Sequence, residues 1–343
     1  MKQGLVAIVL VNYNSVSFLI ECLESIYRMD YPFFQVIVVD NSTENQEKEI
    51  ETLRGWLEGS SNNEVYSHSR FSALLTREIQ KPELVILEES ERFQEHDFPE
   101  SSLVLIKSQQ NDGFAGGCNK ALEYIAAQKK FEFVWLLNTD TFVMPEALGT
   151  LVEKIKENEN LIAVSSKLLY YDFPTIINLI GGKFHSSLWR FGFVPIGYLE
   201  VDQGQYDREV PIDTPAMASC LFRMSYLENV GYMREDYFLY SEDVEWFERM
   251  RRKGYEFAYQ YKSVVYHRES AITQQIKKQS LYYYVRNKVH FYLNYYPRVT
   301  YKIGLGISLL RDIWGNLRRG YFSHLFVIFQ AIRDGIQGKL GKI

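Results

Sequence analysis

Polar side chains that could hold a charged ligand follow a buried strand near the middle of the chain. Four apolar residues, Val134 to Leu137, predict a strand that is buried on both faces, as in a parallel sheet. The run ends at Asn138, and Asp140 comes two residues later. Ligands of an open α/β sheet bind beyond the carboxyl ends of its strands, where a carboxylate could hold a hard cation against a phosphate. The alternative is a plain turn, because Asn, Thr and Asp all favour turns.

Two adjacent carboxylates, Glu242 and Asp243, stand at the predicted start of a helix that ends near Gly254, with Ser241 as the N-cap. The favourable interaction of acidic side chains with the helix dipole explains most such pairs. The chemical alternative is that one of them is a general base that faces a cleft. His267 stands at the end of the last predicted strand, where a histidine is more often structural than a ligand.

The elements that must position these side chains begin with a strand, a helix and a second strand. Leu5 to Val11 predicts the first strand, and the turn-forming residues 12–15 follow it. Ser17 is the predicted N-cap of the helix, and Val36 to Val39 predicts a second buried strand that ends at Asp40. A βαβ unit of this kind requires a parallel pair. Both strands therefore leave polar side chains at the same edge of the sheet.

A glycine-rich segment opens the next helix of this half. Residues 103–106 predict a strand, Asn111 to Asn119 follows it with Gly113, Gly116 and Gly117, and a helix is predicted from Lys120 to Gln128. Glycines at a helix start let the backbone approach a phosphate. The alternative is a tight turn with close helix packing. The segment is neither G-x-G-x-x-G nor a P-loop, which argues against NAD enzymes and kinases.

The rest of the chain is read more coarsely. Residues 59–101 predict an insertion, a hairpin or an excursion from the sheet, with one strand-like run at 84–87. Residues 167–210 have no clear periodicity and predict a loop-rich region. Further strands are predicted at 162–165, 216–222, 255–261 and 263–266, and further helices at 44–57, 225–229 and from Pro145.

Composition limits the class of protein. The 343 residues can build a large core in one or two domains. Three distant cysteines, Cys22, Cys118 and Cys220, without metal-binding spacing predict a reduced cytoplasmic setting. The N-terminal apolar run is too short for a signal peptide or a membrane span.

Charge is distributed unevenly along the chain. The net charge is −5, but residues 271–343 contain twelve Lys/Arg against two Asp/Glu, so that this part carries +10 and the remainder −15. A basic, aromatic-rich tail predicts a surface that meets something anionic, such as a membrane face. No recognised nucleic-acid motif accompanies the tail, so nucleic acid is not an expected partner.

Six segments occur in a recognisable order. They are Val11 to Asn14, Val38 to Asn41, Asn111 to Asn119, Leu136 to Thr141, Glu242-Asp243, and Val265 to His267. Together they resemble family 2 glycosyltransferases, and most of all the bacterial rhamnosyltransferase-like branch, over about residues 5–58 and 103–297. The resemblance implies a GT-A fold with a mostly parallel central sheet flanked by helices. It divides the chain into a catalytic domain (1–270, with a nucleotide-binding half at 1–141 and an acceptor half at 142–270) and a helical, basic C-terminal extension (271–343).

The resemblance also implies an activity. A sugar would move, with inversion, from a nucleotide-diphosphate sugar of the dTDP-rhamnose or UDP-hexose type to a glycan or polyprenyl-linked acceptor. The setting would be bacterial surface polysaccharide synthesis in the cytoplasm, with peripheral contact at the inner face of the membrane through the C-terminal extension. A homodimer is left open.

Roles for individual residues on the donor side follow from their matching positions. Asp40 would contact the base of the nucleotide, and its pocket would be lined by Asn12, Tyr13 and Asn14. The segment with Asn111, Gly113, Gly116, Gly117 and Asn119 would pass beside the nucleotide-sugar. Asn138-Thr139-Asp140 stands where the family carries Asp-x-Asp, so that Asp140 would hold Mg²⁺ or Mn²⁺, with His267 similar in position to a second ligand.

On the other side of the cleft, Asp243 would be the general base, with Glu242 as the second candidate. The acceptor or phosphate side would be lined by Glu242, Trp246, Arg286 and Asn287. Asn138 departs from the family pattern and removes one negative charge from the cation site, so metal binding is expected to be weak or substrate-dependent. Metal-free catalysis, with Lys or Arg neutralising the leaving group, stays open.

Two rival classes can be weighed against this reading. A nucleotide-sugar-binding scaffold without turnover would be favoured by Asn138 but opposed by the retained Asp140, Asp243 and His267. A nucleotidyltransferase would need a glycine-rich basic loop directly after the first strand, which residues 12–15 do not provide.

Overall fold

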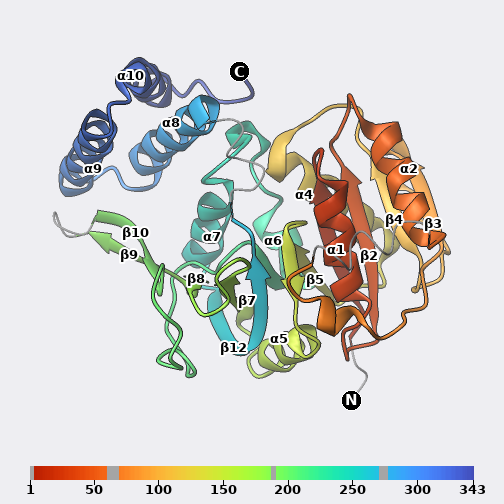
Figure 1. Cartoon of the computed structure of the whole chain (residues 1–343). Coiled ribbons are helices and arrows are strands. Elements are labelled where there is room, and N and C mark those ends of the chain that lie inside the picture. The colour runs from red at the N-terminus through yellow and green to blue at the C-terminus, as the bar shows by residue number, and fades with distance from the viewer. Residues whose placement is uncertain (1–3, 60–68, 187–190, 270–276) are drawn as a thin grey trace.

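A computed structural model describes residues 4–59, 69–186, 191–269 and 277–343. Within these residues ten strands form one twisted sheet, and helices cover both of its faces (Figure 1). The strand order is β3-β4-β2-β1-β5-β11-β7-β12-β6, and β8 pairs with β7 off this path. A short hairpin of β9 and β10 stands apart from the sheet.

The N-terminal half is a parallel sheet. Its elements are β1 (Val6–Asn12), α1 (Val16–Ile26), β2 (Phe34–Asp40), α2 (Gln46–Leu57), β3 (Leu84–Glu88), β4 (Leu103–Lys107), α4 (Gly113–Gln128) and β5 (Phe133–Leu137). All neighbours among β3, β4, β2, β1 and β5 pair in parallel. The predicted βαβ unit is confirmed, and the carboxyl ends of these strands share one edge. The N-cap of α1 is Ser15 instead of the predicted Ser17.

Within the described residues 69–101, the strand-like run belongs to the main sheet and is not part of a hairpin or an excursion, which corrects that prediction. Its strand β3 pairs in parallel with β4 and extends the main sheet at its edge. The apolar run from Leu84 to Leu87 finds backbone partners there, which a free loop could not offer. Two short 3-10 turns, at Ser72–Leu75 and Glu89–Phe93, flank this strand. Residues 60–68 of the predicted insertion lie outside the described residues.

The second half mixes strand directions. Its elements are β6 (Thr141–Val143), α5 (Ala147–Lys156), β7 (Leu161–Tyr170), β8 (Ile177–Leu179), β9 (Gly181–Ser186), β10 (Phe191–Ile196), β11 (Ser219–Arg223), α6 (Met224–Val230), α7 (Glu242–Arg252) and β12 (Glu256–His267). Strand β11 runs antiparallel between β5 and β7, and β12 is parallel to β7 but antiparallel to β6. The central sheet is therefore parallel in one half and mixed in the other.

Two further predictions need correction in this half. The region 167–210, predicted to be loop-rich, contains the end of β7 and the strands β8, β9 and β10, although residues 187–190 lie outside the described part. The strands predicted at 255–261 and 263–266 form one strand, β12, whose register on β7 shifts between Gln260 and Val264. A bulge keeps such a strand continuous while it re-aims the side chains beyond it.

Helices on both faces explain why the strands are apolar throughout. In β1, Val6, Ile8 and Leu10 pack on the side of α1, α2 and α5, whereas Ala7 and Val9 pack on the side of α4, α6 and α7. Successive side chains of a strand point to opposite faces, so that a strand in the middle layer must be apolar at every position. Polar residues are consequently left to the strand ends.

Three helices complete the chain beside the acceptor half: α8 (Lys277–Tyr295), α9 (Val299–Arg318) and α10 (Phe322–Ile336). Helix α8 lies between α7 and the outer helices α9 and α10 (Figure 1). No helix in the described ranges is long and apolar enough to cross a bilayer. The predicted boundary between residues 270 and 271 lies outside the described residues, and the division into 1–270 and 271–343 stays a prediction.

Candidate active site

Neighbouring strand ends bring the first predicted residues together. In the sheet, β1 lies between β2 and β5, with Asn12 opposite Asp40 and Leu10 opposite Leu137. The residues that follow β5, Asn138 and Asp140, therefore begin one strand away from Asn12. This edge is where an open α/β sheet binds its ligands.

Asp40 is a buried carboxylate with one oxygen in use. Its Oδ1 accepts hydrogen bonds from Asn12 Nδ2 and from the Ser42 backbone N–H, each at 3.1 Å. Its Oδ2 is buried and has no hydrogen-bond partner among the described residues. Burial raises the pKa of Asp40, although the hydrogen bonds from Ser42 and Asn12 oppose this effect. The side chain thus offers an unused acceptor to a ligand that brings an N–H group.

Asn12 supports Asp40 and has no spare group of its own. Its Nδ2 also lies 3.0 Å from Glu49 Oε2, and its Oδ1 accepts a hydrogen bond from Ser15. Of the two residues beside it, Tyr13 is half-buried and Asn14 is exposed in a left-handed backbone conformation. We infer that Asn12 positions Asp40, while Tyr13 and Asn14 border the open side.

The glycine-rich segment is helical earlier than predicted. Helix α4 begins at Gly113, so Gly116 and Gly117 lie within its first turns. A Cβ atom at Gly117 would lie 2.5 Å from Val11 Cγ1, which shows that this glycine serves close packing of the helix on the sheet. Asn119 is buried and exchanges hydrogen bonds with the backbone of Met233. The contacts of these three residues fit the packing alternative, and the predicted place of this segment beside a nucleotide-sugar stays a prediction.

The start of α4 still belongs to the edge. Gly113 has a φ of +74°, and its carbonyl accepts a hydrogen bond of 2.9 Å from Asn41 Nδ2, next to Asp40. Its own N–H is bound at 2.9 Å by the side chain of Asn111, which is half-buried. On its other side, the Phe114 N–H donates to the carbonyl of Phe238 at 3.3 Å. The helix start therefore connects Asp40 with the segment that precedes α7.

Asp140 and His267 form a close pair across the sheet. Strand β12 ends at His267, whose Nε2 lies 3.3 Å from Asp140 Oδ1 and 3.3 Å from Asn138 Nδ2. On the other side of the ring, Nδ1 lies 3.2 Å from Asn178 Oδ1. Because an amide oxygen only accepts, Nδ1 carries the proton and Nε2 is free to act as a ligand. Sequence reasoning did not find Asn178, which only the pairing of β8 brings here.

Mutual attraction changes both pKa values of this pair. Burial raises the pKa of Asp140, but the nearby His267 outweighs this effect and leaves that pKa below its ordinary value. Burial lowers the pKa of His267, yet Asp140 and then Glu269 reverse this effect and raise it. Each group thus favours the charged form of the other, and a metal cation could take the place of a proton between them.

The pair fits part of a divalent-cation site. Two adjacent ligands, each about 2.1 Å from an octahedral ion, lie about 3.0 Å apart. The separation of 3.3 Å between Asp140 Oδ1 and His267 Nε2 is close to that value. No group of three or more His, Cys, Asp or Glu side chains within the described ranges could hold a metal ion. Two protein ligands are therefore available, and a substrate diphosphate would have to supply others.

Arg268 is a residue of this site that sequence reasoning missed. Its backbone N–H donates to the Asp140 carbonyl at 3.0 Å, and its guanidinium lies 3.6 Å from the centre of the Tyr171 ring. One terminal nitrogen is paired with Glu21, whereas Nη1 is buried and has no hydrogen-bond partner among the described residues. The only sequence signal was its place directly after His267.

The acidic pair lies at the start of α7, as predicted. Glu242 is 5% exposed, and its Oε2 has no hydrogen-bond partner within the described chain. Asp243 is half-buried, and its Oδ1 accepts the Val244 backbone N–H at 2.8 Å. Burial and then the charge of Asp243 raise the pKa of Glu242 to about 8, and burial raises the pKa of Asp243. The more buried Glu242 is the less readily ionised of the two, so Asp243 is the better candidate for a base.

A sequence model of the family described as "Glycosyltransferase like family 2" matches residues 88–289, which is more than half of the chain. The chain belongs to this glycosyltransferase-like family 2. The matched range contains Asp140, the acidic pair, His267 and Arg286. It does not contain α9 or α10.

Known proteins agree with this family 2 assignment. The chain is 28% identical, over 151 residues, to the low-salt glycan biosynthesis hexosyltransferase Agl10 of Haloferax volcanii, which covers 43% of this chain and 46% of that relative. The chain thus matches about half the length of this curated relative.

Two solved structures share the fold. One is the mannosyltransferase PcManGT of Pyrobaculum calidifontis, in complex with GDP-Man and Mn²⁺, with a TM-score of 0.55 and 14% identity over 99% of this chain and 89% of that one. The other is GalNAc-T7 with UDP, GalNAc and Mn²⁺, with a TM-score of 0.54 and 10% identity over 94% and 58% of the two chains. The predicted GT-A fold, with a helical C-terminal region, is confirmed.

Arg286 and Asn287 hold the loop that precedes Glu242 and Asp243. Both side chains are 0% exposed. Asn287 Nδ2 lies 2.9, 2.9 and 2.8 Å from the carbonyl oxygens of Tyr237, Leu239 and Tyr240, and Arg286 donates to the Tyr237 carbonyl at 3.0 Å. These contacts hold the loop and, through Arg286 and the Gly341 carbonyl at 2.6 Å, the C-terminal segment, and the predicted role on the phosphate or acceptor side stays a prediction.

Trp246 makes its contacts in the core. It is fully buried, its indole N–H donates to the Gly231 carbonyl at 2.8 Å, and its ring packs against Phe222. It belongs to the core on the α7 side of the sheet and does not line an acceptor site. Its position in the motif predicted a place at the site, whereas its indole packs between α7 and the sheet.

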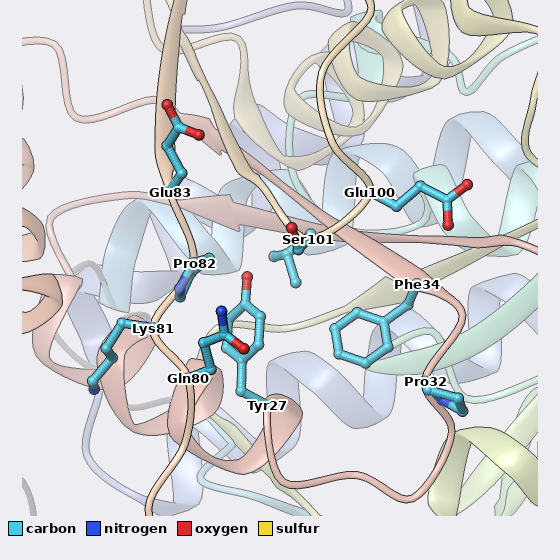
Figure 2. A pocket seen from close by; sticks show the side chains of 10 residues that line it. Tyr27, Pro32, Phe34, Gln80, Lys81, Pro82, Glu83, Glu100 and Ser101 are labelled. Carbon is cyan, nitrogen blue, oxygen red and sulfur yellow. The ribbon is translucent and has the colours of Figure 1, made fainter.

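A hollow of about 580 Å³ lies at the opposite edge of the sheet (Figure 2). Figure 2 shows it between the segment with Gln80, Lys81 and Pro82 and the amino end of β2, where Phe34 and Tyr27 line it. The amino ends of parallel strands are not where this fold class binds its ligands. The carboxyl edge of the sheet is therefore the better candidate for the active site.

Proposed function

We propose that this family 2 chain is an inverting glycosyltransferase that moves a sugar from a nucleotide-diphosphate sugar, of the dTDP-rhamnose or UDP-hexose type, to a glycan or polyprenyl-linked acceptor. One observation carries the proposal: at a single sheet edge, the unused oxygen of Asp40, the pair of Asp140 and His267, and the segment leading to Asp243 come together. A base-recognising acceptor, a cation site and a general base are the parts that the reaction requires.

Asp40 would recognise the nucleotide base. Its buried Oδ2 can accept a hydrogen bond, and uracil, thymine and guanine each carry a ring N–H that could donate it. Tyr13 and Asn14 border this position from the β1 side. Asn12 would act through Asp40 by holding its other oxygen.

Asp140 and His267 would hold Mg²⁺ or Mn²⁺. When bound there, such a cation would neutralise the charge that develops on the departing nucleoside diphosphate. Asn138 makes this site less negative than an Asp-x-Asp site, so we propose that Arg268 adds positive charge through its unused Nη1. Both solved structures that share the fold contain Mn²⁺, which supports the metal.

Asp243 would accept the proton of the acceptor hydroxyl. As that oxygen forms its bond to the anomeric carbon, the bond from this carbon to the diphosphate oxygen breaks, and its electron pair leaves with the diphosphate. A single displacement of this kind inverts the anomeric carbon and needs no enzyme nucleophile. Burial and the charge of Asp243 disfavour ionisation of Glu242, which would leave Asp243 as the base.

The cellular role that we propose is bacterial surface polysaccharide synthesis, at the cytoplasmic face of the membrane, in a rhamnosyltransferase-like branch of the family. Support comes from the basic C-terminal extension and from the glycan-biosynthesis name of the relative in Haloferax volcanii. A second function, a nucleotide-sugar-binding scaffold with little turnover, is favoured by Asn138 alone.

Ligand-induced thermal stabilisation tests the donor proposal. UDP-, dTDP- and GDP-sugars are added to the purified protein with Mn²⁺, and one nucleotide class is expected to raise the melting temperature, because a ligand of the folded state stabilises it. Asp40→Asn should abolish this rise, whereas Asp97→Asn, at an exposed position, should not. No rise with any nucleotide-sugar would overturn the proposal.

Release of nucleoside diphosphate separates the two functions. With a cognate donor and a mixture of glycan and polyprenyl-linked acceptors, a transferase releases the nucleotide in proportion to sugar transferred. A protein that is stabilised by the donor but releases none would be the scaffold.

A further inference from the structure

Helices α9 and α10 each carry an apolar stripe that the fold does not use. In α10, Phe322, Phe326, Phe329 and Ile336 are exposed, and in α9, Val299, Ile303, Leu310 and Trp314 are exposed. Five of these side chains, Val299, Leu310, Trp314, Phe322 and Phe326, expose between 65% and 75% of their area. Exposed large apolar side chains are ordinary singly, but a set of eight on two adjacent helices is not.

The spacing places each set on one side of its helix. Successive members of the α10 set are four, three and seven residues apart, and those of the α9 set are four, seven and four apart, which keeps each within a narrow arc. The opposite side of α10, with Ile328, Ala331 and Gly335, is buried against α8. Both helices therefore have an apolar side on the outside of the molecule (Figure 1).

Positive charge accompanies the stripes. Lys302, Arg318 and Arg319 are exposed on or beside α9. The two acidic residues of these helices are turned inward, since Asp312 pairs with Lys288 at 2.8 Å and Asp334 is buried and accepts a hydrogen bond from Tyr282. A hollow of about 390 Å³ is lined by Phe326, Phe329, Gln330 and Arg333, so aromatic rings and a cation border the same depression.

We propose that the outer face of α9 and α10 lies on an anionic membrane surface, with its apolar stripes in the headgroup region and its cations at the lipid phosphates. An apolar stripe flanked by Lys and Arg is how a helix binds in the plane of a bilayer. This inference names the surface for the membrane contact in the proposed function, and it rests on that function only for the choice of a lipid-linked acceptor.

A second copy of the chain fits this face less well. A symmetric contact would bring the same positive surface of each copy against the other, which opposes association. A nucleic acid would also fit less well, because half of the stripe consists of aliphatic side chains without a face for base stacking. An anionic lipid surface satisfies both the charge and the aliphatic side chains.

The segment that follows α10 contacts residues near the candidate site. Gly341 donates its N–H to the Asp236 carbonyl at 2.6 Å, and Lys342 Nζ lies 3.2 Å from the Asn111 carbonyl. Gly341 lies five positions after Ile336, the last member of the α10 stripe, a span of at most about 18 Å. A lipid-linked acceptor held at this face would therefore have its sugar end near the segment that leads to Asp243.

Sedimentation with vesicles tests the proposal on the full chain. Vesicles of phosphatidylcholine alone are compared with vesicles that contain phosphatidylglycerol, at low and at high salt. We expect the protein to pellet with the anionic vesicles at low salt and less at high salt, since screening weakens attraction between surface charges. If the protein stays in the supernatant with anionic vesicles at low salt, the proposal fails.

Matched variants locate the face. Phe322→Ser with Phe326→Ser should lower the vesicle partition coefficient by about tenfold or more, whereas Phe93→Ser with Phe173→Ser, at exposed positions on the body, should not. Arg318→Glu with Arg319→Glu should weaken anionic binding more than Lys48→Glu with Lys253→Glu, which makes the same change of charge elsewhere. Equal losses in the test and control variants would overturn the assignment to α9 and α10.

Two further measurements separate this proposal from its rivals. A concentration-dependent dimer that Phe322→Ser with Phe326→Ser abolishes, without vesicle binding, would assign the face to self-association and overturn the membrane proposal. Donor-induced thermal stabilisation is recorded on the same samples. Stabilisation without vesicle binding removes only the membrane proposal, and vesicle binding without stabilisation removes only the proposed donor.

Discussion

The two carboxylates at the start of α7 have different environments although they are neighbours. Glu242 is buried with an unpartnered oxygen, whereas Asp243 is half-buried and accepts one backbone hydrogen bond. Two nearby carboxylates cannot easily both ionise, so one keeps a proton. This difference suits a reaction that needs one base.

Replacement of Asp243 tests its role. Asp243→Asn is expected to lower kcat by about 10²-fold or more while donor affinity is kept, because the amide cannot take a proton from the acceptor. Steady-state kinetics and donor-induced thermal shift measure the two effects. Asp172→Asn, at an exposed position, is the control. Turnover near that of the wild type would move the role of base to Glu242.

Glu242 makes stability depend on pH. Its pKa of about 8 in the folded protein lies above the ordinary carboxyl value of 4.5, so the folded state keeps a proton that the unfolded chain releases. The free energy of unfolding therefore falls as the pH rises from about 4.5 to about 8. Glu242→Gln should remove this fall. The melting temperature of the variant relative to that of the wild type should therefore rise from about pH 5 to about pH 9. A difference in melting temperature that stays constant over this range would contradict the raised pKa of Glu242.

Asp140 should matter more than His267 for donor binding. A carboxylate is a better ligand for Mg²⁺ or Mn²⁺ than an imidazole, so Asp140→Ala is expected to weaken donor affinity by about tenfold or more, and His267→Ala by less. Titrations of donor with Mn²⁺ and with EDTA measure both variants. Full activity in excess EDTA would contradict a requirement for the metal and would favour Arg268 as the group that neutralises the diphosphate.

At the scale of elements, α8 determines the shape of the loop before α7. Three non-glycine residues of this loop, Phe238, Tyr240 and Ser241, have positive φ values between 64° and 66°. Such conformations are unfavourable and persist only where the surroundings impose them. The side chain of Asn287 supplies that constraint, because its amide nitrogen is within hydrogen-bond reach of three loop carbonyls.

Removal of this amide should loosen the loop. Asn287→Ala removes a donor from the carbonyls of Leu239 and Tyr240, while that of Tyr237 keeps Arg286. The change is expected to lower the free energy of unfolding by about 3 kcal/mol and to lower kcat more than donor affinity. Asn287→Asp should not rescue it, since a carboxylate cannot donate. Asn294→Ala, on the exposed side of the same helix, is the control for denaturation and kinetics. Equal effects of Asn287→Ala and Asn294→Ala would refute the role of the loop contact.

At the scale of the whole molecule, the three thiols lie in three layers. Cys22 is in α1, Cys220 is in β11 in the middle of the sheet, and Cys118 is in α4 on the other face. All three are buried and free. Burial raises the pKa of Cys22 to about 12 and raises the pKa values of Cys118 and Cys220 as well. Each thiol can therefore report whether its layer has opened.

Thiol labelling should follow global unfolding. In native buffer we expect no reaction with a thiol reagent, because the reactive thiolate is both scarce and inaccessible. Along a denaturant titration, the three thiols should become reactive together at the unfolding midpoint seen by circular dichroism, as in a cooperative transition. Reaction of one thiol at lower denaturant would show that its layer opens separately.

Local pattern alone predicted the central parallel strands and the sheet edge at which we propose the site. Strands packed between two helical layers must be apolar at every position, so the runs before Asn12, Asp40 and Asn138 could be recognised, and polar residues could lie only at their ends. The order of the motifs then indicated the family, which the match to residues 88–289 confirms.

Only the tertiary structure decided which partners individual side chains contact. Trp246, Asn119 and Asn287 stand in matching motifs, yet their groups are taken up by Gly231, Met233 and the 237–240 loop, which are distant in sequence. The same holds for the apolar residues of α10, since periodicity marks an apolar side but not whether a neighbouring helix covers it. Contacts between distant segments depend on how elements pack, and no spacing within one element contains that information.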